Sequence, residues 1–119
     1  MKTECAAAVF CVKNLEASMK FFIEVLGFTE EFIFGEYAGI EHGNVTIHLA
    51  QAGHPNVHTP GTGNVYIFCD EVDEYHKTIT AKGANTKAAP KDWPYGMRDF
   101  IVLDPDGNQL AFGMPVKKD

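Results

Sequence analysis

Residues 95–113, YGMRDFIVLDPDGNQLAFG, describe two strands joined by a tight turn. The turn is built on residues 104–108, where proline fixes φ and glycine or asparagine accepts a positive φ. Apolar residues alternate with polar ones on both sides of it, which indicates half-buried strands. Strand geometry then predicts that Gln109 and Ala111 share one face, while Leu110 and Phe112 share the other. The hairpin is therefore a candidate wall of a binding site.

The residues before this hairpin predict a strand and a helix. Asn64 to Cys69 is an apolar run typical of a buried strand, and Asp70 has the chemistry of a helix N-cap. The helix that follows presents one apolar face and ends at Gly83; that face consists of Val72, Tyr75 and Ile79. Residues 88–94 are predicted to form a loop.

The first half of the chain shows the same order of elements. Residues 6–13 predict a strand, Asn14 a helix N-cap and Gly27 a helix end. The apolar face of the helix consists of Leu15, Met19, Phe22 and Leu26. Three further strands are predicted: Thr29 to Phe34, Tyr37 to Glu41 and Val45 to Ala50.

This order predicts an internal repeat. Val9 and Val65 are 56 residues apart, and so are Gly27 and Gly83. Two similar units at a fixed spacing indicate a duplicated architecture. We expect a single domain over residues 1–119, with module one at about 5–52, a linker at about 53–62 and module two at about 63–115.

Composition restricts the possible partners. The chain has 119 residues, 22% of them charged, and a net charge of −6. This balance argues against nucleic acid, whose binding depends on Lys and Arg. No apolar run is long enough for a membrane span, and no secretory signal can be drawn, so we expect a cytoplasmic protein. Three cysteines without close spacing favour free thiols.

Three motifs together resemble the vicinal oxygen chelate superfamily, which includes glyoxalase I, extradiol dioxygenases and bleomycin-resistance proteins. They are VKNLEASMKFFIEVLGF at 12–28, YAGIEHGNVTIHLA at 37–50 and DFIVLDPDGNQLAF at 99–112. The resemblance implies an α+β fold. Two tandem βαβββ modules would form an open, curved mixed sheet with helices on the convex face. It also implies a homodimer with ligand clefts.

The resemblance also indicates where a metal would bind. Metal-dependent members of the superfamily place ligands at positions that correspond here to Ala7, His48, Asn64 and Ala111. Only His48 is a good ligand, whereas a catalytic metal normally needs three. We therefore expect neither a metal nor another cofactor, and expect His48 to pack, to form a hydrogen bond or to contact ligand.

The layout is most similar to the bleomycin-resistance branch, which binds a drug without transforming it. The ligand-binding residues expected from this resemblance and from strand alternation are Glu36, Tyr37, His48, Asn64, Tyr66, Phe68, Trp93, Tyr95 and Gln109. Aromatic faces and carboxylates suit a small planar or cationic ligand, such as a glycopeptide drug. Alternatively, Glu36 is a solvated turn residue, and the aromatic residues at 37, 93 and 95 pack at the dimer interface.

Two other functions stay open. An enzyme of the lyase or dioxygenase type would take metal ligands from His42, His48 or Glu41, and a loop pair, His54 and His58, is a weaker candidate. A carrier or regulatory module for a metabolite is the third possibility. No other catalytic group of residues is evident, and Arg98 is expected to form an intramolecular ion pair.

Overall fold

The computed structural model describes residues 1–53, 55 and 59–116 and contains two βαβββ modules in tandem, the second with its edge strand split into two short pieces. The elements of the first are β1 (Ala7–Val12), α1 (Leu15–Lys20), the π-helix η1 (Phe21–Val25), β2 (Thr29–Phe34), β3 (Tyr37–His42) and β4 (Val45–Gln51). Those of the second are β5 (Asn64–Phe68), α2 (Val72–Ala81), β6 (Asn85–Thr86), β7 (Lys91–Asp92), β8 (Met97–Leu103) and β9 (Gln109–Pro115).

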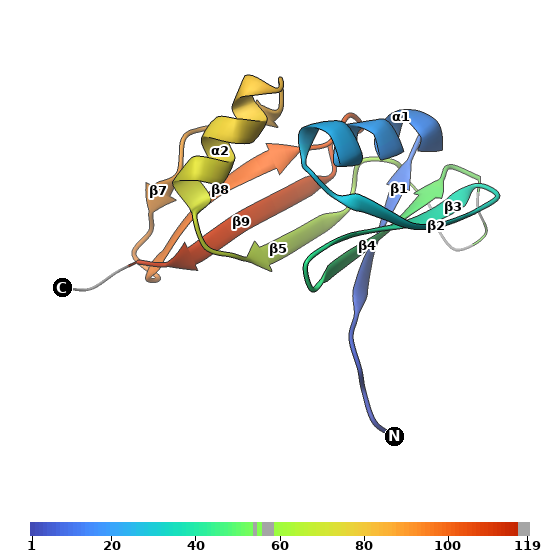
Figure 1. Ribbon diagram of the computed structural model, residues 1–119, viewed down its shortest axis with the longest axis horizontal. Coiled ribbons are helices and arrows are strands. Elements are labelled where there is room, and N and C mark those ends of the chain that lie inside the picture. The colour runs from blue at the N-terminus through green and yellow to red at the C-terminus, as the bar shows by residue number, and fades with distance from the viewer. Residues whose placement is uncertain (54, 56–58, 117–119) are drawn as a thin grey trace.

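Each module forms its own mixed sheet (Figure 1). The N-terminal sheet has the order β1-β4-β3-β2, and the C-terminal sheet has the order β5-β9-β8-β6, with β7 also paired to β8. In each sheet the first strand runs parallel to the last, while the other pairs are antiparallel. Both helices lie on the same side of the molecule, so each sheet keeps one face free of helices. We call this the open face.

The core joins the two modules on the helix side of the sheets. Its buried side chains include the predicted apolar face of the first helix and the core-facing positions of the predicted hairpin. Leu110 and Phe112 are buried, whereas Gln109 and Ala111 are partly exposed on the open face, as the alternation predicts. In the described part of the chain, no helix is both long and apolar enough to cross a membrane.

The first helix begins as predicted, with the Asn14 side chain accepting a hydrogen bond from the Ala17 amide at 2.9 Å. After Lys20 the helix widens into η1, where the Leu26 amide donates to the Phe21 carbonyl. A π-helical turn holds one residue more than an α-helical turn. The two helices start 72 − 15 = 57 residues apart, but the glycines that follow them are 83 − 27 = 56 residues apart. The first helical segment is therefore one residue longer than the second, and the π-helical turn accommodates that residue.

The spacing of 56 is therefore wrong for the strands. Val65 packs against the core, whereas Val9 lies exposed on the open face, so the two valines are not equivalent. β1 and β5 instead start 64 − 7 = 57 residues apart, which places Ala7 and Asn64 at matching positions.

The predicted N-cap of the second helix is also wrong. The N-cap of α2 is Glu71, not Asp70, and its side chain makes no capping hydrogen bond. Glu71 has φ 50° and ψ 40°, and it is the only residue other than glycine with a positive φ among those described. This left-handed backbone turns the chain out of β5 and into α2. Glutamate in that region is strained, since its Cβ crowds the backbone.

The turn at 104–108 ties the two modules together. The Asp104 carboxylate accepts hydrogen bonds from the amides of Asp106 and Asn108, which closes the turn. The fully buried Asn108 side chain donates to the Cys11 carbonyl at 3.1 Å and accepts from the Gly63 amide at 2.7 Å. Asn108 does not take a positive φ, contrary to one option in the prediction; Gly107 does, at 98°.

Two short strands lie between α2 and the hairpin, where a loop was predicted only for residues 88–94. β7 falls within residues 88–94 and pairs with β8, and β6 pairs with the far end of β8. Their two-residue length left no periodicity in the sequence to detect.

Candidate functional site

An aromatic cluster occupies the open face of the N-terminal sheet. The Tyr37 hydroxyl lies 2.8 Å from His48 Nδ1, and the Phe32 ring packs edge-on against His48 with ring centroids 5.2 Å apart. Phe32 reaches this position by crossing Gly39, where an added Cβ would lie 2.3 Å from its ring. His48 is thus hydrogen-bonded and packed, one of the roles expected for it. The surface can offer a ligand aromatic faces and hydrogen-bonding groups.

A buried carboxylate lies at the centre of the open face of the C-terminal sheet. Asp99 Oδ2 accepts hydrogen bonds from the hydroxyls of Tyr66 at 2.9 Å and Tyr95 at 2.7 Å. Tyr66 extends from β5 across β9 at Gly113, where an added Cβ would lie 2.0 Å from its hydroxyl. Burial and the bond to Asp99 raise the pKa of Tyr66, and the bond to Asp99 is the main cause of the raised pKa of Tyr95. Both phenols therefore stay protonated donors at neutral pH.

Exposed aromatic rings surround this carboxylate. Trp93 and Tyr95 stack with centroids 6.2 Å apart and an interplanar angle of 9°, and Lys91 Nζ lies 4.4 Å from the Trp93 ring centroid. Phe68 is 75% exposed and packs beside Tyr66, with ring centroids 5.1 Å apart. An exposed aromatic surface of this kind is typical of a binding or assembly surface.

The expected site residues thus fall into three groups. Tyr66, Phe68, Trp93 and Tyr95 gather around Asp99, and Asn64 and Gln109 are paired neighbours on the same sheet. Tyr37 and His48 are together on the other sheet. Glu36 is apart from both groups: its carboxylate accepts from the Gln51 amide group at 3.3 Å, and Gln51 Oε1 accepts from the first amide of α1.

Two residues of these clusters were not expected from the sequence. Asp99 was not among the predicted site residues, although its alternation with Phe100 places it on the open face. Phe32 reaches His48 because a β-bulge interrupts the pairing of β2 with β3 between Glu30 and Phe32. No signal in the sequence marks that bulge.

Arg98 lies on the opposite face of β8 from Asp99. Its guanidinium pairs with Asp73 of α2 at 2.7 Å and with Asp92 of β7 at 3.0 Å, which confirms the predicted intramolecular ion pair. The hydrogen bond from Arg98 is the main cause of the lowered pKa of Asp73. Arg98 is thereby held on the helix side of the sheet.

The four superfamily metal positions do not form a metal-binding set. In each sheet two of these positions lie diagonally across from each other on the open face. In the first sheet Ala7 pairs with Thr46, and His48 lies two residues further along that strand. In the second sheet Asn64 pairs with Gln109, and Ala111 lies two residues further along. Their side chains offer one imidazole and one amide, short of the three ligands that a catalytic metal needs. Across residues 1–53, 55 and 59–116, no three His, Cys, Asp or Glu side chains could hold a metal together.

The other histidine candidates are dispersed. His42 is at the end of β3, where its ring packs against Phe28 with centroids 5.4 Å apart, on the helix side of the molecule. Glu41 precedes it on β3, paired with Thr46. His54 and His58 lie outside the described residues.

Known proteins resemble this chain in sequence and in fold. Bleomycin resistance proteins of Geobacillus stearothermophilus and Staphylococcus aureus are each 26% identical to it over 122 residues, covering 89% of this chain and 92% of theirs. A bleomycin-binding protein from bleomycin-producing Streptomyces verticillus, solved with copper(II)-bleomycin, aligns with a TM-score of 0.79 and 23% identity over 98% of this chain and 99% of that one.

Another solved structure supports the same fold, and a family model matches most of the sequence. TioX from Micromonospora sp. ML1 aligns with a TM-score of 0.80 and 20% identity over 96% of this chain and 100% of its own. The family model covers residues 5–112. The chain therefore belongs to the Glyoxalase/Bleomycin resistance protein/Dioxygenase superfamily.

Proposed function

We propose that this protein is a bleomycin-resistance-like binding protein that sequesters a planar or cationic small molecule. The observation that carries the proposal is the Asp99 carboxylate, held by two phenols and surrounded by exposed aromatic rings. A carboxylate in a mostly apolar surface attracts a cation, and the rings attract the planar part of the same ligand. The named relatives support a drug as that ligand.

The proposed mechanism is stoichiometric binding, without a metal and without bond making or breaking. The cleft would lie at the interface of a cytoplasmic homodimer, where the open face of one sheet meets a second sheet. The aromatic rings left exposed on the open faces support a cleft that is covered by a partner or a ligand. The alanines at the metal positions 7 and 111 support binding without a metal. Exposed apolar surface of this extent is usually covered by a partner or a ligand.

A calorimetric titration of the metal-free protein with bleomycin tests the proposal. We expect one drug per chain, and affinity about tenfold lower in Asp99→Asn and in Trp93→Ala, because each removes one charge-assisted or stacking contact. Ile23→Ala, an exposed apolar change on the helix side, should bind as the unchanged protein does. Equal affinity in all variants would contradict the role of this surface, and absence of binding would contradict bleomycin as the ligand.

Elemental analysis separates binding from the enzymatic alternative. A divalent ion that survives dialysis at about one per chain would favour a metal-dependent lyase or dioxygenase, with ligands from atypical positions. Sedimentation of the purified protein at several concentrations tests the homodimer, which a purely monomeric species would contradict.

A further inference from the structure

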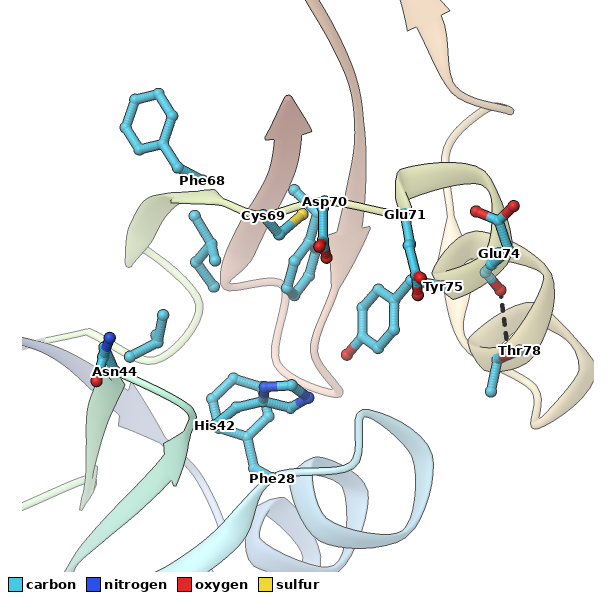
Figure 2. Close-up of a pocket in the computed structure, with 13 residues that line it drawn as sticks. Phe28, His42, Asn44, Phe68, Cys69, Asp70, Glu71, Glu74, Tyr75 and Thr78 are labelled. Carbon is cyan, nitrogen blue, oxygen red and sulfur yellow. Dashed lines mark hydrogen bonds between the residues drawn. The ribbon is translucent and has the colours of Figure 1, made fainter. Parts of the chain in front are cut away.

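A cavity of about 480 Å³ lies between the two modules, on the helix side of the sheets (Figure 2). One wall is formed by Phe28 and the β3–β4 turn, and the other by the end of β5 and the first turns of α2. Its volume is within the range of small-molecule sites. The cavity is separate from the open faces, because Ile67 and Phe112, which line it, point to the core side of β5 and β9.

The floor of the cavity is aromatic. The Tyr75 ring packs against Phe112 with centroids 4.9 Å apart and faces His42 at 6.3 Å, and His42 in turn packs against Phe28. The Tyr75 hydroxyl donates to the Leu26 carbonyl at 2.5 Å, which fixes the ring between the modules. These rings form a rigid surface against which a flat apolar group can pack.

The mouth of the cavity is acidic. In Figure 2 the carboxylates of Asp70 and Glu71 point toward the space above Tyr75 and His42, while the Phe68 ring points away. Glu74 also lines the cavity, and none of the described lining residues is Lys or Arg. Within the described part of the chain, neither Asp70 nor Glu71 has a hydrogen-bonded or ion-paired partner for its carboxylate.

The positions of these two acids are unusual for a helix start. Asp70 is suited to capping α2 but does not cap it, and Glu71 takes the N-cap position with a left-handed backbone and no capping bond. A left-handed backbone at a residue other than glycine is strained, and such strain is concentrated at functional sites. Its effect here is that both carboxylates are directed to the cavity mouth instead of to the amides of α2.

We propose that this intermodule cavity is a second binding site for a small organic cation. Its floor is formed by Phe28, His42, Tyr75 and Phe112, and Asp70 and Glu71 lie at its mouth. The ligand would carry a protonated amine or amidine on a flat apolar body. The body would pack on the rings while the charge meets the carboxylates, an arrangement that a neutral or anionic ligand cannot use equally well. The inference does not depend on the function proposed for the open faces.

A nuclear magnetic resonance titration with benzamidine and its neutral analogue benzamide tests the site on the full chain. Benzamidine should shift the amide signals of residues 42–45 and 69–75, and benzamide should bind about tenfold more weakly because it lacks the charge. Shifts confined to the neighbourhood of Tyr66, Tyr95 and Asp99 would overturn the proposal. So would equal affinity for both compounds, or no shifts at about 10 mM benzamidine.

Paired variants with the same net charge isolate the carboxylates. Asp70→Asn with Glu71→Gln should lower the affinity for benzamidine about tenfold, since both changes keep shape and remove charge. Glu16→Gln with Glu24→Gln, two exposed acids on α1 and η1, should leave it within about twofold, because those charges are distant and screened. If both pairs lower the affinity equally, the effect is one of net charge, and the proposed site is wrong.

Discussion

The two places where the modules meet are built differently. At the end of β1, the turn at 104–108 closes over the junction, and Asn108 bonds to Cys11 and Gly63. At the end of β5, the matching turn between β3 and β4 contains only Gly43 and Asn44, and a cavity remains. The two modules therefore do not make the same contacts where they meet. The longer turn at 104–108 covers one junction, whereas the shorter turn at 43–44 leaves a cavity at the other.

The two helix starts differ in the same way. Asn14 and Glu71 are 71 − 14 = 57 residues apart, the spacing of the strands, and each is the N-cap of its helix. Asn14 accepts a capping bond, whereas Glu71 is strained and does not cap. The closed junction thus adjoins the capped helix, and the cavity adjoins the strained one.

Removing the Asn108 side chain should have the largest effect on stability. Asn108→Ala deletes three hydrogen bonds of a fully buried side chain and leaves the Gly63 amide without its partner, so the free energy of unfolding should fall by about 3 kcal/mol. Asn44→Ala, the matched change in the open turn, should alter it by less than about 0.5 kcal/mol because Asn44 is exposed. Urea denaturation measures both, and similar losses would contradict the contrast between the junctions.

Substitutions at the two N-cap positions should change the free energy of unfolding in opposite directions. Asn14→Ala should lower the free energy of unfolding by about 1 kcal/mol through loss of the cap. Glu71→Asn should raise it by about 0.5 kcal/mol, because asparagine adopts a left-handed backbone more readily. The same change at Glu74, inside α2, should instead be destabilising, since asparagine is a poor helix former. A loss for Glu71→Asn would show that residue 71 is not strained.

A further expected effect concerns the ion pair of Arg98 with Asp73, which ties the first turn of α2 to β8. Arg98 lowers the pKa of Asp73, so the pair stabilises the fold above the ordinary Asp pKa of 3.8 and loses this contribution as the pH falls through the lowered value. Asp73→Asn should cost less than about 1 kcal/mol at neutral pH, because both groups are partly exposed. Urea titrations at acid and neutral pH should show this difference shrinking toward acid pH; a difference that grows there would contradict it.

Sequence patterns were sufficient for the main elements of the fold. β2 has the predicted bounds, Thr29–Phe34, and the apolar face of the first helix is buried as the 3.6-residue period requires. The N-cap of α2 was missed because local propensity favours Asp70, whereas the chain leaves β5 through a left-handed residue. Propensity describes preference in isolation, and tertiary structure can override it.

The candidate site was only partly predictable. Alternation placed Tyr66 and Phe68 on the open face, but the meeting of Tyr66, Tyr95 and Asp99 depends on three strands and on the missing side chain at Gly113. Of the acids at the intermodule cavity, the sequence singled out only Asp70, and as a helix N-cap. Contacts across several strands of one sheet, like contacts between modules, leave no period in a single sequence, so neither cluster could be predicted from spacing.

The π-helical turn at Phe21–Val25 accounts for the difference in helix length between the two modules. It is the place where the first module carries one residue more than the second, and the surplus is absorbed within a single turn, leaving Asn14 and Gly27 in their capping roles. The difference in helix length between the two modules is thus confined to these five residues.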